Sequence, residues 1–187
     1  FFFVAAGIIA FLNTRAILRD ADSVTHTHEV LTVLDDILSL IKDAETGQRG
    51  FVLTGDEKYL TPYNAAITEI EERLEDAERL VGDNARQLER IPALRKRIDA
   101  KLKELKETIE IRRTDGFDAV RERVVTDRGM LEMEAIREQI ALMEAQEREL
   151  RTGRLGEMNN AYQTAVASNI VTTVLGVFLT SVVGHLF

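Results

Sequence analysis

Carboxylates and histidines are the residues of this sequence that could do chemistry, as general acids and bases or as metal ligands. Glu69, Glu71 and Glu72 lie between apolar residues of helical periodicity, which indicates a solvated helix face rather than an acid–base pair. His26 and His28 are two residues apart, so a helix places them on different faces and disfavours a shared metal ion. No Cys is present to form a disulfide or a thiolate site. We predict no catalytic residue, no metal site and no cofactor.

A run of polar residues inside an otherwise apolar helical pattern is the second candidate site. Glu45, Gln48 and Arg49 fall on or beside the apolar stripe, where buried polar groups need partners. Gly47 and Gly50 interrupt the same stretch and allow a neighbouring segment to approach closely. We favour a structural interpretation, in which a polar layer fixes the register of packed helices. The alternative is a sensing site, because polar side chains inside a helical bundle also hold small anions.

The composition of the chain indicates that these residues lie on long helices. Charged residues make up 30% of the 187 residues and hydrophobic ones 45%, with two Pro and no Trp, a balance typical of helices packed side by side. The formal charge is -8, and acidic and basic residues are interspersed. Because a nucleic-acid surface needs a concentrated basic face, we predict no nucleic-acid partner.

Two stretches have the composition of membrane helices. No Asp, Glu, Lys or Arg occurs after residue 158, and residues 161–187 are long enough to cross a bilayer of about 30 Å. Residues 1–14 are equally uncharged but would reach only about 21 Å, so we interpret them as a truncated first membrane helix. A secretory signal peptide is the alternative. Either interpretation places residues 15–160 outside the cytoplasm and makes the lipid bilayer a partner.

Helical periodicity and turn residues predict four long amphipathic helices between these stretches. They cover about residues 23–55, 57–81, 83–113 and from 130 onward, with a short helix at 117–125. Their apolar stripes, which recur at steps of three and four, include Val24, Leu34, Ile41, Tyr63, Ile67, Ile70, Leu74, Leu94, Ile98, Leu105, Met133, Ile136 and Ile140.

These elements predict an all-α fold, an up-down-up-down four-helix bundle. Its first and last helices are expected to continue into the two membrane helices, since no Pro separates them from those segments. Pro62 falls in the first turn of the second helix, where its missing N–H costs little. Pro92 is expected to kink the third helix near its start.

The polar run in the first long helix resembles the signature of a known family. It reads Glu45, Thr46, Gly47, Gln48, Arg49, Gly50, then an aromatic residue, a hydrophobic residue, Leu, Thr and Gly55. This run is similar to that of the type-three CHASE domain, the cyclase- and histidine-kinase-associated sensory extracellular module. Weaker similarity extends over about residues 20–154. The resemblance implies an extracytoplasmic helical bundle that passes signals to cytoplasmic output domains, and it implies no particular ligand.

The sequence and the resemblance together predict the sensor region of a bacterial receptor in the inner (cytoplasmic) membrane, with its central domain in the periplasm or outside the cell. We expect a homodimer that feeds an output domain of the same polypeptide. A histidine kinase of a two-component system is the first expectation for that domain, and a diguanylate cyclase is the next. The alternatives are the ligand-binding region of a chemotaxis receptor and a structural membrane anchor that senses nothing. Catalysis is expected in the output domain rather than in these residues.

Overall fold

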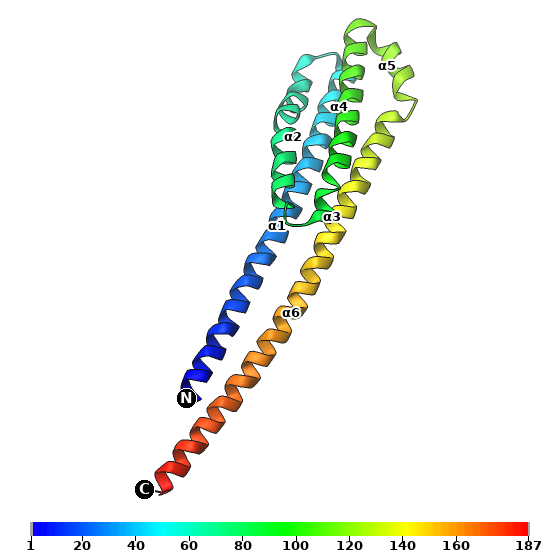
Figure 1. Ribbon diagram of the computed structural model, residues 1–187. Helices are drawn as coiled ribbons and strands as arrows, with labels where there is room; N and C mark the ends of the chain where they lie inside the picture. Colours follow the sequence, from blue (N-terminus) through cyan, green and yellow to red (C-terminus); the bar gives the residue numbers. More distant parts are fainter. Residues whose placement is uncertain (1, 187) are drawn as a thin grey trace. The chain divides into compact units, whose positions relative to one another are not determined.

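The computed structural model describes residues 2–186, and it describes every side chain from residue 25 to residue 156. Residues 2–186 are almost entirely helical, with no strand among them, so the predicted all-α class is confirmed (Figure 1). Phe1 and Phe187, the end residues of the two predicted membrane helices, lie outside the described residues. The side chain of Val24, from the first predicted apolar stripe, also lies outside them.

Two long helices begin and end the described chain. α1 (Phe2–Thr54) is one continuous helix, in agreement with the prediction that no break separates the N-terminal segment from the first amphipathic stripe. α6 (Arg128–Leu186) is also continuous, although Gly153 and Gly156 lie within it. Each Gly destabilises a helix interior by only about 1 kcal/mol relative to Ala, so the helix can continue through both residues.

A glycine ends α1 and a capping carboxylate starts the next element. Gly55 has a φ of +72°, a left-handed conformation that residues with a Cβ rarely adopt. Asp56 then caps the short 3-10 helix η1 (Glu57–Leu60) by accepting a hydrogen bond from a backbone N–H. α2 (Thr61–Leu80) follows directly, with Pro62 in its first turn as predicted.

The third predicted helix, over residues 83–113, is in fact two helices. They are α3 (Ala85–Leu88) and α4 (Ile91–Thr114). Pro92 is the reason, because in one continuous helix its ring would clash with the carbonyl four residues earlier. It lies instead in the first turn of α4, where its absent N–H has no partner to lose. The expected kink is therefore a complete break.

A short helix and a tight turn connect α4 to α6. α5 (Gly116–Val124) begins at a glycine with a φ of +86°, one residue before the predicted start. The turn that follows contains Asp127, whose φ of 55° is also left-handed. Asp is among the few residues with a side chain that visit this region routinely. This turn places the first residues of α6 against α4, as the contacts described below show.

The described helices divide into two compact units, residues 28–147 and the two chain ends, 1–27 with 148–187. In residues 28–147, α1, α2, α4 and α6 share one apolar core. This four-helix core consists of Val30, Val33, Leu34, Ile37, Ile41, Ile70, Leu74, Ala77, Val81, Ile91, Leu94, Ile98, Met133, Ile136, Ile140 and Met143. A smaller three-helix cluster draws on α1, α2 with η1, and α4, and it consists of Ala44, Phe51, Leu60, Tyr63, Ala66, Leu105 and Ile109.

The unit of the two chain ends contains the C-terminal part of α6. Among residues 2–186, α6 is the helix whose length and composition would allow it to cross a membrane. Its side chains there include Val174 and Phe178, which are 62% and 63% exposed. The first membrane helix at residues 1–14 and the domain limits at 15–160 and 161–187 stay predictions.

Candidate functional site

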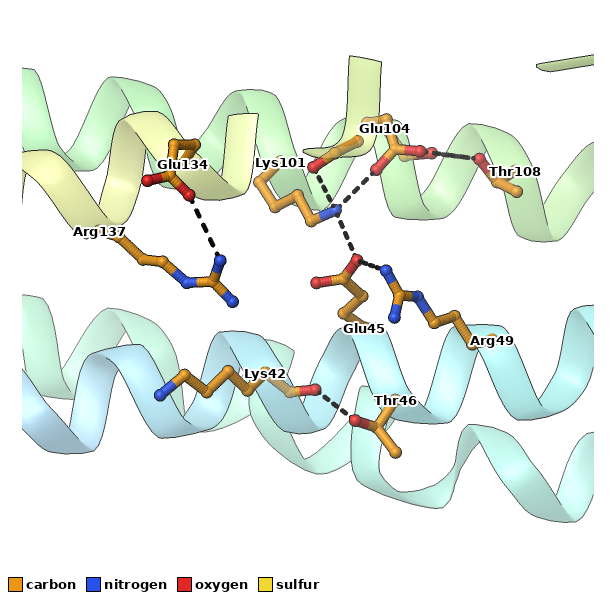
Figure 2. A network of polar contacts seen from close by, with 10 residues as sticks. Lys42, Glu45, Thr46, Arg49, Lys101, Glu104, Thr108, Glu134 and Arg137 are labelled. Atoms are coloured by element: carbon orange, nitrogen blue, oxygen red, sulfur yellow. Dashed lines mark hydrogen bonds and ion pairs between the residues drawn. The ribbon is translucent and has the colours of Figure 1, made fainter. Parts of the chain in front are cut away.

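A buried lysine lies between the four-helix core and the three-helix cluster. Lys101 of α4 is 1% exposed, and its ammonium donates hydrogen bonds to the carbonyl of Gly129 at 2.9 Å and to Oε2 of Glu104 at 3.2 Å. Oε1 of Glu45, from α1, lies 3.5 Å from the same nitrogen. Figure 2 shows the three side chains converging. We call Glu45, Lys101, Glu104 and Gly129 the polar layer; it joins α1, α4 and the first turn of α6.

Burial explains why the polar layer needs so many partners. An isolated ammonium costs several kcal/mol to remove from water, and only well-placed acceptors offset this cost. Lys101 has three donors and three acceptors within 3.5 Å. Glu104 is itself buried, and Thr108 donates to its Oε1 at 3.2 Å. A Cβ added at Gly129 would lie 3.0 Å from that carboxylate, so the close approach of α6 depends on a glycine.

Glu45 connects the polar layer to solvent. Its Oε1 accepts a hydrogen bond from Arg49 at 2.7 Å, and the Arg49 side chain is 70% exposed. Glu45 is therefore shared between a buried cation and an exposed one (Figure 2). Thr46, the next residue of the predicted signature, points elsewhere: it is exposed and donates to the carbonyl of Lys42 at 2.8 Å.

The two glycines of the signature serve helix packing. A Cβ at Gly47 would lie 2.8 Å from the carbonyl oxygen of Tyr59 and 3.1 Å from the backbone nitrogen of Tyr63. A Cβ at Gly50 would lie 2.8 Å from the Tyr59 ring. Both distances are shorter than real contacts, so only glycine lets α1 meet η1 and the start of α2 this closely. The structural interpretation of Gly47 and Gly50 agrees with these contacts.

Gly55, the last residue of the signature, ends α1 and lies beside an arginine of α4. Arg112 donates from Nε to the carbonyl of Val52 at 2.8 Å, and its guanidinium would be 2.9 Å from a Cβ at Gly55. The arginine thereby satisfies a carbonyl at the end of α1 that the helix itself leaves without a partner. Gly55 is a helix terminus with a tertiary cap and contributes no side chain to a site.

A cavity of about 440 Å³ opens beside the polar layer. Its lining comes from α1, α4, α5, the α5–α6 turn and the first turn of α6, and consists of Glu45, Gln48, Arg49, Val52, Leu53, Lys101, Glu104, Leu105, Arg123, Val124, Asp127, Gly129 and Met130. Three cations and three anions are among these residues, so the lining is neutral overall. Small-molecule sites in proteins have this size and this mixture of apolar walls with a few polar groups.

Two polar groups at the cavity lack partners. Gln48 is 5% exposed, and its amide forms no hydrogen bond within the part of the chain that the structure describes. Arg123 donates from Nη2 to Glu107 at 2.6 Å, but its Nε atom is buried without a partner. Arg128 also contacts Glu107, at 3.3 Å, and does not line the cavity. The Nε atom is fully enclosed by protein, whereas the Gln48 amide is not, so the amide can bond to a ligand or water in the cavity.

The structure separates the seven predicted site residues into groups. Three of them, Glu45, Gln48 and Arg49, line the cavity. The three glycines serve packing and helix termination, and Thr46 bonds within its own helix. Sequence analysis missed Lys101 and Arg123. Lys101 could have been found, because it occupies the apolar stripe of α4 at steps of three from Ile98 and four from Leu105.

The arrangement has the groups that charge recognition needs. Among the described residues, no group of three or more His, Asp or Glu side chains could hold a metal ion. The carboxylates of Glu45 and Glu104 are occupied by Lys101, and neither faces a nucleophile in the contacts described above. What the cavity can do chemically is present buried hydrogen-bond donors beside apolar walls.

Comparison with known proteins gives one family. A family model described as CHASE3 domain matches residues 20–157, which is more than half of the chain. The match includes the whole polar layer and every residue that lines the cavity. It agrees with the resemblance seen over about residues 20–154 of the sequence. No curated protein and no solved structure matches the chain.

Proposed function

Because the chain belongs to the CHASE3 domain family of sensory extracellular domains, we propose that residues 15–160 sense a stimulus outside the cytoplasm and transmit it through α1 and α6. The stimulus changes the relative position or tilt of these two helices. Their displacement then reaches a cytoplasmic output domain of the same polypeptide. Rigid helices that shift against one another are a known means of switching in receptors.

The observation that carries this proposal is the position of Lys101. Its ammonium contacts both α1, through Glu45, and the first turn of α6, through Gly129. α1 and α6 are each one continuous helix that includes a predicted membrane segment. A change in the polar layer therefore acts on both helices that lead to the bilayer, without any loop in between to absorb it.

The architecture we propose for the sensor is an up-down-up-down four-helix bundle of α1, α2, α4 and α6. The four-helix core supports it, because all four helices contribute buried residues to that core. The connections are short, which favours antiparallel neighbours. η1 lies in the connection from α1 to α2, and α3 lies in the connection from α2 to α4. α5 lies in the connection from α4 to α6.

We propose that residues 1–14 and 161–187 are membrane helices of the bacterial cytoplasmic membrane. For the second, support comes from exposed apolar side chains such as Val174, Val177 and Phe178, which water would leave unfavourably solvated. The Arg residues that flank the membrane segments would favour the opposite orientation under the positive-inside rule. Long segments translocate regardless of such charges, so we assign the central domain to the outside on the basis of its family.

The output domain that we expect is a histidine kinase of a two-component system, with a diguanylate cyclase next. The family resemblance supports both, since the family's full name refers to its association with cyclases and histidine kinases. Receptors that move membrane helices against one another commonly act as homodimers, and we propose one here. Any kinase or cyclase chemistry belongs to that output domain and not to the polar layer or its cavity.

Cysteine cross-linking in the intact receptor tests the proposal, and these 187 residues contribute no native Cys to the background. Single cysteines in residues 1–14 and 161–187 would report how the two membrane helices pack. Lys101→Met removes the buried cation, and we expect it to change both the cross-linking pattern and the basal output. Lys103→Met is the matched control, because Lys103 is exposed on the same helix.

A milder variant keeps the experiment interpretable if Lys101→Met does not fold. Gly129→Ala would push the Glu104 carboxylate by a few tenths of an ångström and shift the first turn of α6. We expect the same direction of change in cross-linking and output as for Lys101→Met. If both variants fold, lower stability and leave cross-links and output at the wild-type level, the sensor function is wrong and a structural anchor is favoured.

A further inference from the structure

Gln48 and Arg123 define what the cavity could bind. We propose that the cavity holds a small carboxylic acid with a short apolar body, its carboxylate bound by the Gln48 amide and the Arg123 guanidinium. This inference rests on the proposed sensor function, because it identifies the class of stimulus. It assigns Gln48 and Arg123 as binding residues, and it leaves Lys101 as the group that couples the site to the helices.

The donors at the cavity favour an anion. Gln48 can donate two hydrogen bonds from its side-chain amide, and the Arg123 guanidinium has Nη–H donors besides the one that Glu107 accepts. A carboxylate has two oxygens that can accept from several donors at once. Hydrogen bonds in which the acceptor is ionised are also the stronger class. A carboxylate therefore fits the pair better than a neutral acceptor does.

The other charged residues of the lining are occupied. Lys101 already has three acceptors, and together with Arg49 it neutralises Glu45 and Glu104. Neither carboxylate is thus available to attract a cation. Asp127 is the exception, because it is exposed at the cavity and forms no ion pair among the described residues. An amino acid could place its ammonium there, so a plain acid and an amino acid share the same carboxylate anchor.

Apolar residues complete the cavity. Val52 and Leu105 are buried in its wall, whereas Leu53, Val124 and Met130 are 71%, 58% and 59% exposed at its rim. Exposed apolar residues gathered at a cavity mouth mark binding sites. A short aliphatic or aromatic body on the acid would cover them and gain from their removal from water. A bare inorganic anion would leave this surface uncovered.

Binding here would act on the polar layer directly. Gln48 lies three residues after Glu45 on α1, and Arg123 lies on α5, just before the turn into α6. An acid held by both would pull α1 and the α5–α6 turn toward one another. This is the displacement that the sensor function requires, delivered where Lys101 joins the same helices.

Calorimetric titration of the full chain in lipid nanodiscs tests the inference. The probes are isobutyrate, isocaproate, octanoate and leucine, with isoamylamine, isoamyl alcohol and inorganic sulfate as controls. We expect at least one of the organic acids to bind and none of the three controls to do so. Binding by leucine together with its acid counterpart isocaproate would show that an ammonium is accepted, and binding by isocaproate alone would show that it is not. Both results support a carboxylate site.

Matched arginine variants show whether binding uses the cavity. Arg123→Lys keeps a cation beside Glu107 but removes the other donors of the guanidinium, and Gln48→Met keeps the side-chain volume but removes the amide. Each should weaken binding about tenfold or more, the usual effect of losing a hydrogen bond to a charged group. Arg128→Lys changes the other arginine on Glu107, outside the cavity, and should leave the affinity unchanged. Circular dichroism confirms that each variant is folded.

The inference is overturned if no organic acid binds the wild-type chain, if isoamylamine binds as tightly as the acids, or if Arg128→Lys weakens binding as much as Arg123→Lys. The sensor function fails separately. If no acid binds but Lys101→Met still changes cross-linking and output, the ligand class is wrong and the sensor function stands. If an acid binds the cavity and the membrane-helix cross-links do not change, the site stands and the transmission proposal falls.

Discussion

The four-helix core and the three-helix cluster share α1, α2 and α4, and they differ in what covers these three helices. In the four-helix core, α6 contributes Met133, Ile136, Ile140 and Met143, and the buried amide of Gln87 meets this core at the carbonyl of Met143. Beside the three-helix cluster α6 is only beginning, and α5, a turn and a cavity lie there instead. Apolar packing holds the helices together in one region, and charges and open space occur in the other.

This difference shows where the molecule can respond. A close-packed apolar core resists small displacements, since every shift opens voids or forces overlap. The polar layer and the cavity depend instead on a few specific contacts, which a ligand or a mutation can remake. The first turn of α6 lies where apolar packing is incomplete. We therefore expect this turn to be the part of α6 that can be displaced.

The largest expected effect is the loss of the buried cation. Lys101→Met leaves Glu104 buried without its partner, and removing one member of a buried ion pair typically costs about 3–5 kcal/mol. We expect a loss of this size in the free energy of unfolding, measured by urea unfolding of the chain in detergent micelles with circular dichroism. A loss below about 1 kcal/mol would mean that water reaches the polar layer freely.

A double variant separates charge from packing at the same position. Lys101→Met with Glu104→Met removes both charges, and replacing a buried pair with apolar residues of similar volume is often neutral or stabilising. The double variant should therefore recover most of the stability that Lys101→Met loses. No recovery would indicate that the contact to Gly129, rather than the ion pair, carries the stability.

Leucine truncation compares the two apolar regions directly. Leu34→Ala opens a hole in the four-helix core, and we expect a loss of free energy of unfolding near the top of the usual range of about 2–5 kcal/mol. Leu105→Ala lies in the three-helix cluster, at the wall of an existing cavity, so its neighbours lose fewer contacts. The loss of free energy of unfolding for Leu105→Ala should therefore lie near the bottom of that range. Equal losses in the same unfolding assay would contradict the contrast between the regions.

Glycine substitution gives a smaller effect with opposite signs at two sites. Gly47→Ala places a methyl group 2.8 Å from a backbone oxygen, and such overpacking costs about 1–3 kcal/mol. Gly153→Ala is the matched control in α6, where nothing lies within 4 Å of the added Cβ. It should raise stability by about 0.5–1 kcal/mol through helix propensity. Thermal unfolding of both variants measures the difference, and a neutral Gly47→Ala would refute the close approach of η1.

The smallest expected effect is the titration of a surface pair near the three-helix cluster. A hydrogen bond from Arg113 lowers the pKa of Glu57 below its ordinary value, and burial opposes this only in part. The stabilisation is therefore present above the ordinary carboxyl pKa and is lost as the pH falls through the lowered one. NMR titration of the Glu57 carboxyl carbon should show the lowered pKa, and Arg113→Gln should return it toward normal. An unchanged pKa in that variant would exclude the pair.

Much of the fold could be predicted because helical periodicity is a local property. Tyr63, Ile70 and Leu74 were placed on a buried stripe by spacing alone, and all three are buried. The break between α3 and α4 was underestimated, because the sequence identifies Pro92 but not whether the chain bends or unwinds around it. Ile67 was assigned to the same stripe and is 43% exposed, since a stripe of steps of three and four drifts around a helix.

The candidate site was only half predicted, for a physical reason. Glu45 and Gln48 come from one helix and share a short run of sequence, so their spacing reveals them. Arg123 comes from α5, and no local pattern places α5 against α1. Lys101 carries a long side chain that is usually solvated, and its burial depends on acceptors from two other helices. Residues that meet only through tertiary contacts leave little trace in one sequence.

The hydrogen bond from Lys101 to Gly129 also predicts how the output of the proposed sensor would depend on the dose of its stimulus. At 2.9 Å it tolerates little lengthening, because a stretch of about 1 Å would break it and leave a cation without one of its acceptors. Intermediate positions of α6 are therefore costly, whereas a shift by a whole helical turn of about 5.4 Å would present another carbonyl. We expect each molecule to occupy one of two positions of α6. A graded output would then reflect the fraction of molecules that have switched, and not the distance that α6 has moved in each one.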